Sequence, residues 1–438
     1  MNRALCVWLA MAVGASVASA DWPQFQGPNR DGVSTETVKL ADSWPADGPR
    51  VVWKIDGQLG TGFGGPVVAG GKVYLLDRVN DQQDMLRCID LASGKQEWTY
   101  AYFAPPEAKD NPKAGGYKGN YNGSRNLPAV DATGIYTLGP FGDVTCVNAE
   151  THQAVWTTNI IQAYGADLGN WGICQSPVLY KSTVIVAPLS KTAGMVAFDK
   201  ASGAEVWKSE RVGEIAWTSP FISTVDGVDQ VVMLNSRGEP RLVSVDAATG
   251  RKLWIYNGWK CPNPIASHTD CGQGRFFITG GYKAGSVMVQ VSKDGDNWKV
   301  QELFRSKDCG AQACKPVFFK DHIYAKSNDF MEDGAKSGNG LVCLDMTGNL
   351  MWKTSNDNIE EIGSILIADG KIYNFFSEKG NLSVVRAAPE RYEELGTAKV
   401  TSGSNLWGPM AISDGKLLIR SRRSLICLDV SAGGGAAK

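Results

Sequence analysis

The sequence is poor in histidine and in the short motifs on which many enzymes depend. It contains three histidines in 438 residues. It has no HExxH, Walker-loop or GxSxG motif, and no GxGxxG motif placed between a strand and a helix. These absences argue against a zinc peptidase of that type, a P-loop nucleotidase, an α/β-hydrolase and a Rossmann dehydrogenase. Any function has to come from another kind of site.

Excess charge and long apolar runs are also missing. The 44 basic and 45 acidic residues give a net charge of −1, without a basic run. This argues against a groove for nucleic acid and against a polybasic patch that would bind a membrane surface. The one apolar run is N-terminal, follows Arg3 and closes with Ala18-Ser19-Ala20. It is too short for a transmembrane anchor and no cysteine marks a lipoprotein, so residues 1–20 are predicted to be a cleaved signal peptide. We therefore expect a periplasmic or secreted protein that does not span the membrane.

What the sequence has instead is an internal repeat. CIDLASGKQEW (88–98) returns as VAFDKASGAEVW (196–207) and SVDAATGRKLW (244–254), with weaker copies ending at Trp156 and Trp352. Each copy follows a segment such as GPVVAGGKVYLL (65–76). Both halves have two β-rich runs around a short turn, which is typical of a hairpin. One unit therefore predicts a four-stranded antiparallel blade, with strands A to D.

The repeat predicts the fold. Eight units recur about every 45–55 residues, the fifth and seventh degenerate, which suits a β-propeller. The last unit lacks strand D, and RVVWKI (50–55) has the pattern of an unassigned one. We predict an all-β, single-domain, eight-bladed propeller whose ring is closed by this N-terminal strand. The predicted boundaries are a signal peptide at 1–20, an N-terminal extension at 21–49, the propeller at 50–431 and a tail at 432–438.

The tryptophan that ends strand D is expected to dock on the turn glycine of a neighbouring blade and fill the wedge between blades. The predicted docking residues are Trp53, Trp98, Trp156, Trp207, Trp254 and Trp352. Another repeat position takes a small residue, which predicts a tight core slot. Four cysteines occupy it and are expected to stay free thiols: Cys88, Cys146, Cys343 and Cys427.

With these motifs in place, the repeat resembles the tryptophan-docking motif of the quinoprotein family. That family includes the pyrroloquinoline-quinone (PQQ) dehydrogenases and the propeller component of the outer-membrane assembly machinery. The opening WPQFQGPNRDGVS (22–34) is similar to the start of many secreted quinoprotein-like propellers. The resemblance covers nearly the whole mature chain and implies the fold, but one fold of this kind carries many functions.

The loops before each strand A are expected to ring the mouth of the central channel, where variable loops on a rigid scaffold commonly bind ligands. The predicted ligand-binding residues are Arg125, Asn126, Trp171, Gln175, Trp217, His268, Lys315, Glu361 and Trp407. Their aromatic, amide and charged groups suit a planar or sugar-like ligand. The alternative is that the aromatics plug the channel. The B-to-C loops add residues expected to lie on a solvated face: Arg78, Arg237, Glu239, Lys283, Asp329 and Arg422.

Five further cysteines lie near connections between repeats. Two loop disulfides are expected, because an exported protein meets an oxidising compartment. The candidates are Cys309, Cys314, Cys261 and Cys271, and Cys309 with Cys314 is the pair that is easiest to close. The alternative is a thiolate and histidine metal site that includes Cys174 and His268. The sequence has no short CxxC pair, so no metal site is predicted.

For function, the sequence favours a binding or scaffold module for a polypeptide or carbohydrate ligand. The alternative is an oxidoreductase, with PQQ or another small molecule at the channel mouth. The resemblance implies that a PQQ dehydrogenase would carry a vicinal cysteine pair and calcium-binding carboxylates. The chain has no adjacent cysteines, and only Glu360, Glu361 and Asp329 could contribute to a calcium site. We therefore expect no cofactor, no catalytic residue and a monomer.

Overall fold

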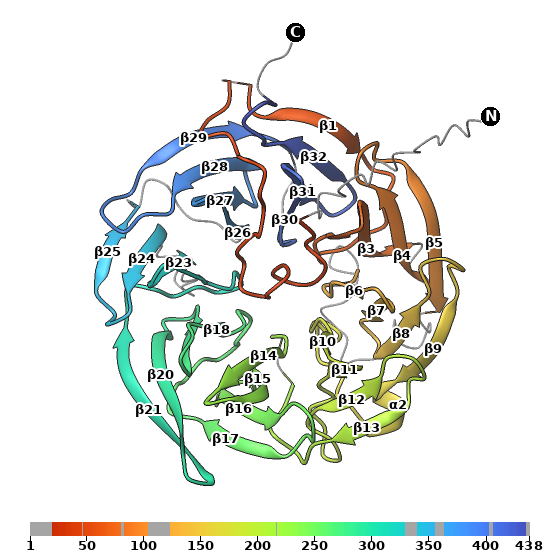
Figure 1. Cartoon of the computed structure of the whole chain (residues 1–438), viewed down its shortest axis with the longest axis vertical. Coiled ribbons are helices and arrows are strands. Elements are labelled where there is room, and N and C mark those ends of the chain that lie inside the picture. The colour runs from red at the N-terminus through yellow and green to blue at the C-terminus, as the bar shows by residue number, and fades with distance from the viewer. Residues whose placement is uncertain are drawn as a thin grey trace, which may run out of the picture.

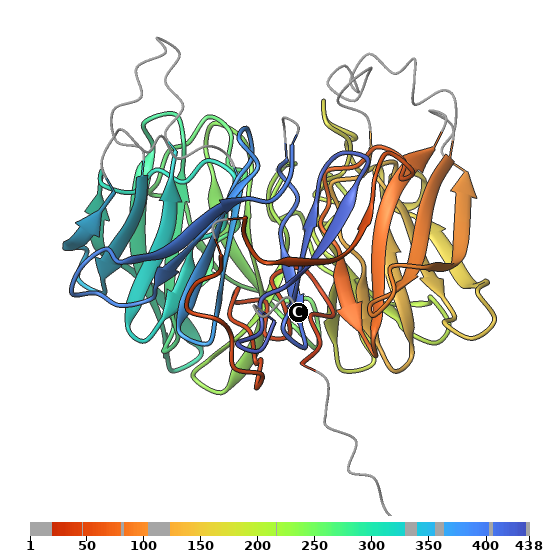
Figure 2. The same cartoon turned by 90° about the horizontal axis from the view of Figure 1, so that it is seen from above.

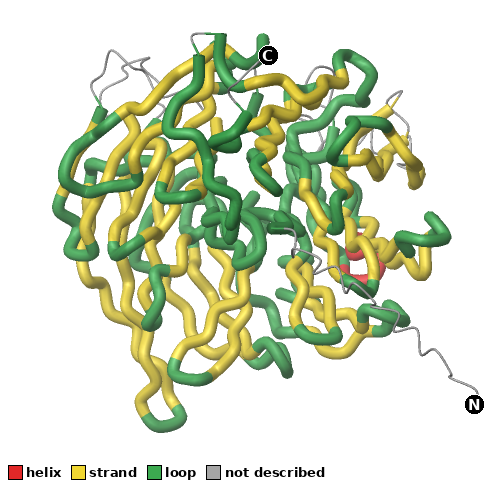
Figure 3. Tube along the Cα trace, turned by 45° about the horizontal axis from the view of Figure 1, so that its top comes forward, coloured by secondary structure: helices red, strands yellow, loops and turns green. Residues whose placement is uncertain are grey.

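Eight four-stranded antiparallel sheets stand around a central axis, as a β-propeller (Figure 1). The computed structural model describes residues 20–45, 47–79, 83–103, 123–215, 217–328, 340–354, 363–402 and 406–434. Within these ranges the only helix is the short α2 (Ile160–Tyr164), and strands and loops make up the rest (Figure 3). The prediction of an all-β, eight-bladed propeller is confirmed.

Each blade places strand A nearest the axis and strand D on the outer rim (Figure 1). The first four blades comprise β2 (Val67–Ala69), β3 (Lys72–Val79), β4 (Gln83–Asp90) and β5 (Gln96–Phe103); β6 (Ala129–Asp131), β7 (Gly134–Leu138), β8 (Asp143–Val147) and β9 (Ala154–Asn159); β10 (Val178–Tyr180), β11 (Thr183–Val186), β12 (Val196–Asp199) and β13 (Glu205–Lys208); and β14 (Phe221–Val225), β15 (Val228–Asn235), β16 (Arg241–Asp246) and β17 (Lys252–Tyr256).

The other four blades comprise β18 (Thr269–Asp270), β19 (Arg275–Gly280), β20 (Gly285–Asp294) and β21 (Asn297–Ser306); β22 (Val317–Phe319), β23 (His322–Ser327), β24 (Gly340–Asp345) and β25 (Leu350–Lys353); β26 (Gly363–Ala368), β27 (Lys371–Phe376), β28 (Asn381–Arg386) and β29 (Glu394–Lys399); and β30 (Ala411–Ser413), β31 (Lys416–Arg420), β32 (Leu425–Asp429) and β1 (Arg50–Ile55).

The ring closes as the sequence predicts. Strand β1 pairs antiparallel with β32, and Trp53 lies opposite Cys427. The first strand of the propeller therefore completes the last blade, and no blade is left with a missing outer strand (Figure 1). This closure removes an edge that would otherwise be open to pairing with another chain.

Tryptophan docking explains why the turn between strands C and D repeats. In the first copy, the Asp90 carboxylate accepts a hydrogen bond from the backbone N–H of Ser93, and Gly94 follows with a positive φ of 71°. The Trp53 ring lies against that glycine, where a Cβ would come within 2.5 Å of the ring, and its Nε1 donates to the Leu91 carbonyl at 2.8 Å. A side chain at the glycine would exclude the ring.

Other blades repeat or vary this contact. Trp156 and Trp207 lie against Gly203 and Gly250 in the same way. Trp98 meets His152 in place of a glycine and stacks on its ring at 4.6 Å between centroids. Trp254 and Trp352 donate hydrogen bonds instead to Gln230 of the same blade and to the Ala388 carbonyl of the next blade.

The recurring small residue lies directly across the strand pair from the tryptophan. Cys88 is opposite Trp98 and Cys343 is opposite Trp352, and the same pairing joins Ala197 to Trp207. A larger side chain at this position would compete with the indole for the same space.

The predicted loop disulfides are not formed. All nine cysteines of the described chain are free, and eight of them are buried. Cys261 packs in a hydrophobic cluster with Trp259 and Phe276, whereas Cys271 belongs to another cluster with Cys309, and Cys314 to a third. The pair expected to close most easily, Cys309 and Cys314, is therefore divided between two clusters.

The predicted N-terminal extension runs through the middle of the ring (Figure 1, Figure 2). Trp22 forms a β-bridge to Val68 of the first blade, and Val33 forms one to Ile367 of the seventh. Between them Arg30 donates to the carbonyls of Pro177 and Pro220, which precede strand A of the third and fourth blades. The extension thus occupies the channel and ties together blades that are far apart in sequence.

The predicted signal peptide lies outside the described residues, except for Ala20. Among the helices that the structure describes, none combines the length and the hydrophobicity needed to cross a membrane.

Candidate ligand-binding site at the channel mouth

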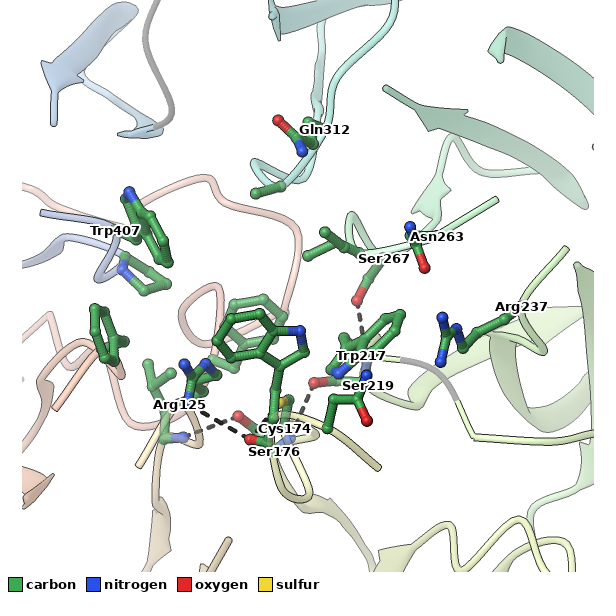
Figure 4. Close-up of a pocket in the computed structure, with 18 of the residues that line it drawn as sticks. Arg125, Cys174, Ser176, Trp217, Ser219, Arg237, Asn263, Ser267, Gln312 and Trp407 are labelled. Atoms are coloured by element: carbon green, nitrogen blue, oxygen red, sulfur yellow. Dashed lines mark hydrogen bonds between the residues drawn. The ribbon is translucent and has the colours of Figure 1, made fainter. Parts of the chain in front are cut away.

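A cavity of about 530 Å³ opens where the loops before strand A converge. We call it the mouth cavity (Figure 4). Its volume falls within the range usual for pockets that bind small molecules. Its wall includes Phe25, Phe63, Arg125, Asn170, Trp171, Cys174, Trp217, Arg237, Asn263, Tyr282, Gln312 and Trp407.

On one side of the cavity, Arg125 is held between two aromatic rings. Its guanidinium carbon lies 4.8 Å from the centre of the Phe63 ring and 5.1 Å from that of Trp171. Its Nη1 also donates to the carbonyl of Gly123 at 3.3 Å. The Phe63 ring continues to Trp407, with 5.3 Å between the ring centroids. Four side chains from four loops therefore form one aromatic and cationic wall.

The opposite side is built from the connection between the third and fourth blades and from the B-to-C loop of the fourth blade. Trp217 is partly exposed, and the guanidinium of Arg237 lies 5.0 Å above its ring. The indole N–H of Trp217 is shielded from solvent and finds no hydrogen-bond partner among the residues that the structure describes. Figure 4 shows Trp217 and Arg237 across the cavity from Arg125 and Trp407. The cavity thus carries an aromatic face and an arginine on each side.

A chain of serines fixes the loops that carry these side chains. The backbone N–H of Leu127 donates to Ser176 Oγ at 3.0 Å, that of Ser176 to Ser219 Oγ at 2.9 Å, and that of Ser219 to Ser267 Oγ at 3.0 Å. Each hydroxyl joins the start of one blade to the next. Side chains on such rigid loops lose little freedom when a ligand binds.

Beneath the floor of the mouth cavity, three buried polar side chains surround the ring of Phe221. Phe25 of the cavity wall contacts the Phe221 ring, with 6.0 Å between centroids. Arg30, His268 and Lys315 surround the same ring at 4.6, 5.2 and 5.5 Å. All three are buried, and we call them the floor cluster.

Burial governs ionisation in the floor cluster. It lowers the pKa of His268 to about 3, with further lowering by the charges of Lys315 and Arg30, so this histidine is neutral at pH 7. It lowers the pKa of Lys315 to about 8 and that of Arg30 to about 9, so both remain mostly protonated at pH 7. Asp31 interacts with the Lys315 charge, which opposes the rise that burial causes in the Asp31 pKa. Within the described part of the chain, neither ring nitrogen of His268 has a hydrogen-bond partner.

The structure separates the predicted site residues into three groups. Arg125, Trp171, Trp217 and Trp407 lie on the wall of the mouth cavity. His268 and Lys315 are buried in the floor cluster rather than exposed at the mouth. Asn126 and Gln175 are buried as well and bond to backbone: Asn126 donates to the Gln175 carbonyl, and the Gln175 amide pairs with both polar groups of Ala187.

Two of the remaining predicted residues, Glu361 and Asp329, lie outside the described residues. Of the B-to-C residues expected on a solvated face, Arg237, Glu239 and Lys283 are exposed and Arg422 is partly exposed. The expectation is wrong for Arg78, which is 5% exposed. Its side chain pairs with the buried Asp84 at 3.2 Å, across the β3–β4 pair, so that each charge compensates the other.

Several wall residues were not predicted. Phe63, Asn170 and Gln312 lie in loops that the repeat alignment places at the mouth, so their position was available from the sequence. Phe25 comes from the N-terminal extension, which lies outside the repeat and gives no alignment. The burial of Cys174, which raises its pKa to about 11, makes this cavity-lining thiol a poor nucleophile at neutral pH.

Comparison with known proteins agrees with this architecture. Residues 110–260 match the family model described as outer membrane protein assembly factor BamB. The matched segment is less than half of the 438-residue chain. The repeat and the docking geometry together match a PQQ-like repeat β-propeller. No curated protein matches its sequence.

Solved structures share the fold of this propeller at low sequence identity. A europium-containing methanol dehydrogenase is 12% identical, with a TM-score of 0.65 over 91% of this chain and 89% of that one. A quinohemoprotein alcohol dehydrogenase from Comamonas testosteroni is 15% identical, with a TM-score of 0.64 over 96% and 81%. BamB from Moraxella catarrhalis is 13% identical, with a TM-score of 0.56 over 87% and 99%. These similarities concern the fold and do not decide the activity.

The described residues of the mouth cavity do not fit a calcium-dependent quinone site. Calcium prefers carboxylate and carbonyl oxygens, and no carboxylate is found among the described wall residues. In the part of the chain that the structure describes, no group of three histidine, cysteine or acidic side chains is arranged to hold a metal. The wall offers arginines instead, which would repel a cation.

Proposed function

We propose that this propeller is a binding module that takes a carbohydrate ligand in the mouth cavity. The observation that supports the proposal is the presence of three partly exposed tryptophans, Trp171, Trp217 and Trp407, around one cavity. Unlike the docking tryptophans, they end no outer strand. Flat aromatic faces bind the apolar faces of sugar rings, while nearby amides such as those of Asn170 and Gln312 provide hydrogen bonds that orient hydroxyl groups.

A polypeptide ligand is the second candidate. The matched family model is described as an outer-membrane protein assembly factor, and the match covers the loops that carry Arg125, Trp171 and Trp217. An extended segment of another protein could place one aromatic or acidic side chain in the cavity. In either case we propose that the protein is exported, because of the predicted signal peptide, and that it acts as a monomer.

An oxidoreductase is less well supported. Two of the similar structures are alcohol-oxidising enzymes by their descriptions, but the wall residues do not fit the calcium-dependent cofactor site. Reconstitution with PQQ and calcium, followed by an assay of alcohol oxidation, tests this alternative. Turnover that depends on both additions would overturn the proposal of a non-catalytic module.

The direct test is calorimetric titration of the purified protein with neutral oligosaccharides and, separately, with unstructured peptides. We expect an oligosaccharide to bind, and Trp217→Ala to weaken that binding by about 1–3 kcal/mol, as loss of an aromatic anchor does. Trp298→Ala serves as the control, because Trp298 lies on the outer strand β21, next to the turn on the opposite face. Binding of peptides alone would replace the carbohydrate proposal with the second candidate. Binding that survives Trp217→Ala would place the ligand elsewhere.

A further inference from the structure

We infer that the ligand of the mouth cavity carries an acidic group, and that it is an acidic sugar such as a uronic acid. The inference rests on the proposed function and narrows its ligand class. It comes from the charge of the cavity, which differs from that of the whole chain. The protein has a net charge of −1, whereas the described wall contains Arg125 and Arg237 and no carboxylate.

The two arginines are held in defined orientations. Arg125 lies between Phe63 and Trp171, and Arg237 lies over Trp217. Stacking on a ring uses the face of the guanidinium and leaves its edge, which carries the N–H donors, available to other groups. A carboxylate can accept two parallel hydrogen bonds from that edge. A sugar ring against Trp217 would bring a carboxylate on its rim close to Arg237.

Among the described residues, Arg237 has no acidic partner. It forms no ion pair with any residue that the structure describes. Two acidic residues of the loops around it already bind other bases: Glu214, whose carbonyl accepts from the Ser236 N–H, pairs with Arg211 at 2.7 Å, and Glu239 pairs with Lys260 at 2.9 Å. The charge of Arg237 is therefore available to a ligand.

The floor cluster adds positive potential from below. Arg30 and Lys315 are buried beneath the cavity, with Phe221 and Phe25 between them and its floor. Charges in such surroundings are screened less than charges in water, so their field reaches further. Asp31 offsets part of it through its interaction with Lys315. With Arg125 and Arg237 on the wall, the cavity favours an anion.

The test compares two disaccharides of the same ring geometry, digalacturonic acid and neutral galactobiose, by calorimetric titration at pH 7 and low salt. We expect the acid to bind at least about tenfold more tightly, and the difference to shrink as sodium chloride is raised. Arg237→Gln should weaken binding of the acid more than binding of the neutral disaccharide, and so remove most of the preference. Arg251→Gln should change neither affinity, because Arg251 is exposed in the turn after β16 on the opposite face.

The possible outcomes separate the two proposals. Equal affinity for both disaccharides would overturn this inference and leave carbohydrate binding in place. Failure of both to bind would overturn the inference and count against carbohydrate binding as well, unless the neutral panel yields another ligand. A third titration uses benzoate, which also has a ring and a carboxylate. Tight binding of benzoate without binding of digalacturonic acid would contradict the assignment to a sugar. Thermal melts of Arg237→Gln confirm that the variant is folded.

Discussion

Trp207→Ala should destabilise the propeller strongly while sparing the mouth cavity. Trp207 is 7% exposed, its ring lies against Gly250, and its Nε1 donates to the Ala247 carbonyl at 3.1 Å. The substitution removes the ring from the wedge between the third and fourth blades and leaves that carbonyl without its partner. Large-to-small changes of this kind typically cost about 3–5 kcal/mol in the free energy of unfolding, and the lost hydrogen bond is included in that cost.

The assay is urea denaturation followed by far-ultraviolet circular dichroism, with Trp217→Ala as the matched variant. Trp217 is partly exposed on the cavity wall and its indole N–H bonds to nothing in the described protein. We therefore expect Trp217→Ala to lower the free energy of unfolding by less than half as much as Trp207→Ala. The order should reverse for ligand binding, where only Trp217→Ala weakens affinity.

Equal losses of stability in the two variants would refute this reasoning, because Trp217 would then be a core residue like Trp207. A loss below about 1 kcal/mol for Trp207→Ala would refute the docking argument itself. Gly250→Ala provides an independent check. The added Cβ would collide with the Trp207 ring, and the glycine has a φ of 74°, so this small change should also destabilise the protein.

Three further predictions concern the interior. Arg30→Met should lower the free energy of unfolding by about 1–3 kcal/mol for each of the two proline carbonyls that lose a donor. A urea midpoint equal to that of the wild type would contradict the claim that the N-terminal extension ties the blades together through Arg30. The pKa of His268 is lowered from 6.5 to about 3, so below about pH 6.5 the unfolded chain binds a proton that the folded chain does not, and the free energy of unfolding falls with pH. His268→Gln should remove this fall between pH 6.5 and 4, which amounts to up to about 1.4 kcal/mol per pH unit. An unchanged dependence of the unfolding free energy on pH would show that the histidine is not buried and neutral. Peptide mapping without reduction should find Cys261 and Cys271 unlinked, since they pack in separate clusters, and a linked peptide would contradict the packing between blades.

The repeat made the fold predictable because the same side-chain contact recurs from blade to blade. The turn glycine, the small residue across from the tryptophan and the tryptophan itself are each required by one contact, so they recur with fixed spacing. Trp53 and Cys427 show the strength of this pattern. They are about 370 residues apart in the sequence, yet the repeat predicted that their strands would pair.

The site was predictable only where it followed the repeat. Trp171, Trp217 and Trp407 could be placed at the mouth because each precedes a strand A. The alignment gave the same loop position to His268 and Lys315, but the two are buried because the N-terminal extension brings Arg30 and Asp31 into the channel beside them. That extension belongs to no repeat, so its path depends on long-range contacts that a local pattern does not specify.

The buried ion pair next to the B-to-C turn of the first blade also could not be predicted from the sequence pattern. Arg78 was expected in solvent because charged loop residues usually are, but Asp84 lies opposite it across the β3–β4 pair and both are buried. The raised pKa of Asp84, about 7, reflects that burial. Sequence spacing could show that the two residues lie near one turn, but not that the surrounding loops would cover them.

The most direct test of ligand binding at the mouth is a crystal structure of the protein with digalacturonic acid at a saturating concentration. We expect electron density for a sugar ring against Trp217 or Trp171, with its carboxylate within hydrogen-bond distance of Arg237 or Arg125. Density for the disaccharide at another surface, with the mouth cavity empty at that same concentration, would contradict the account.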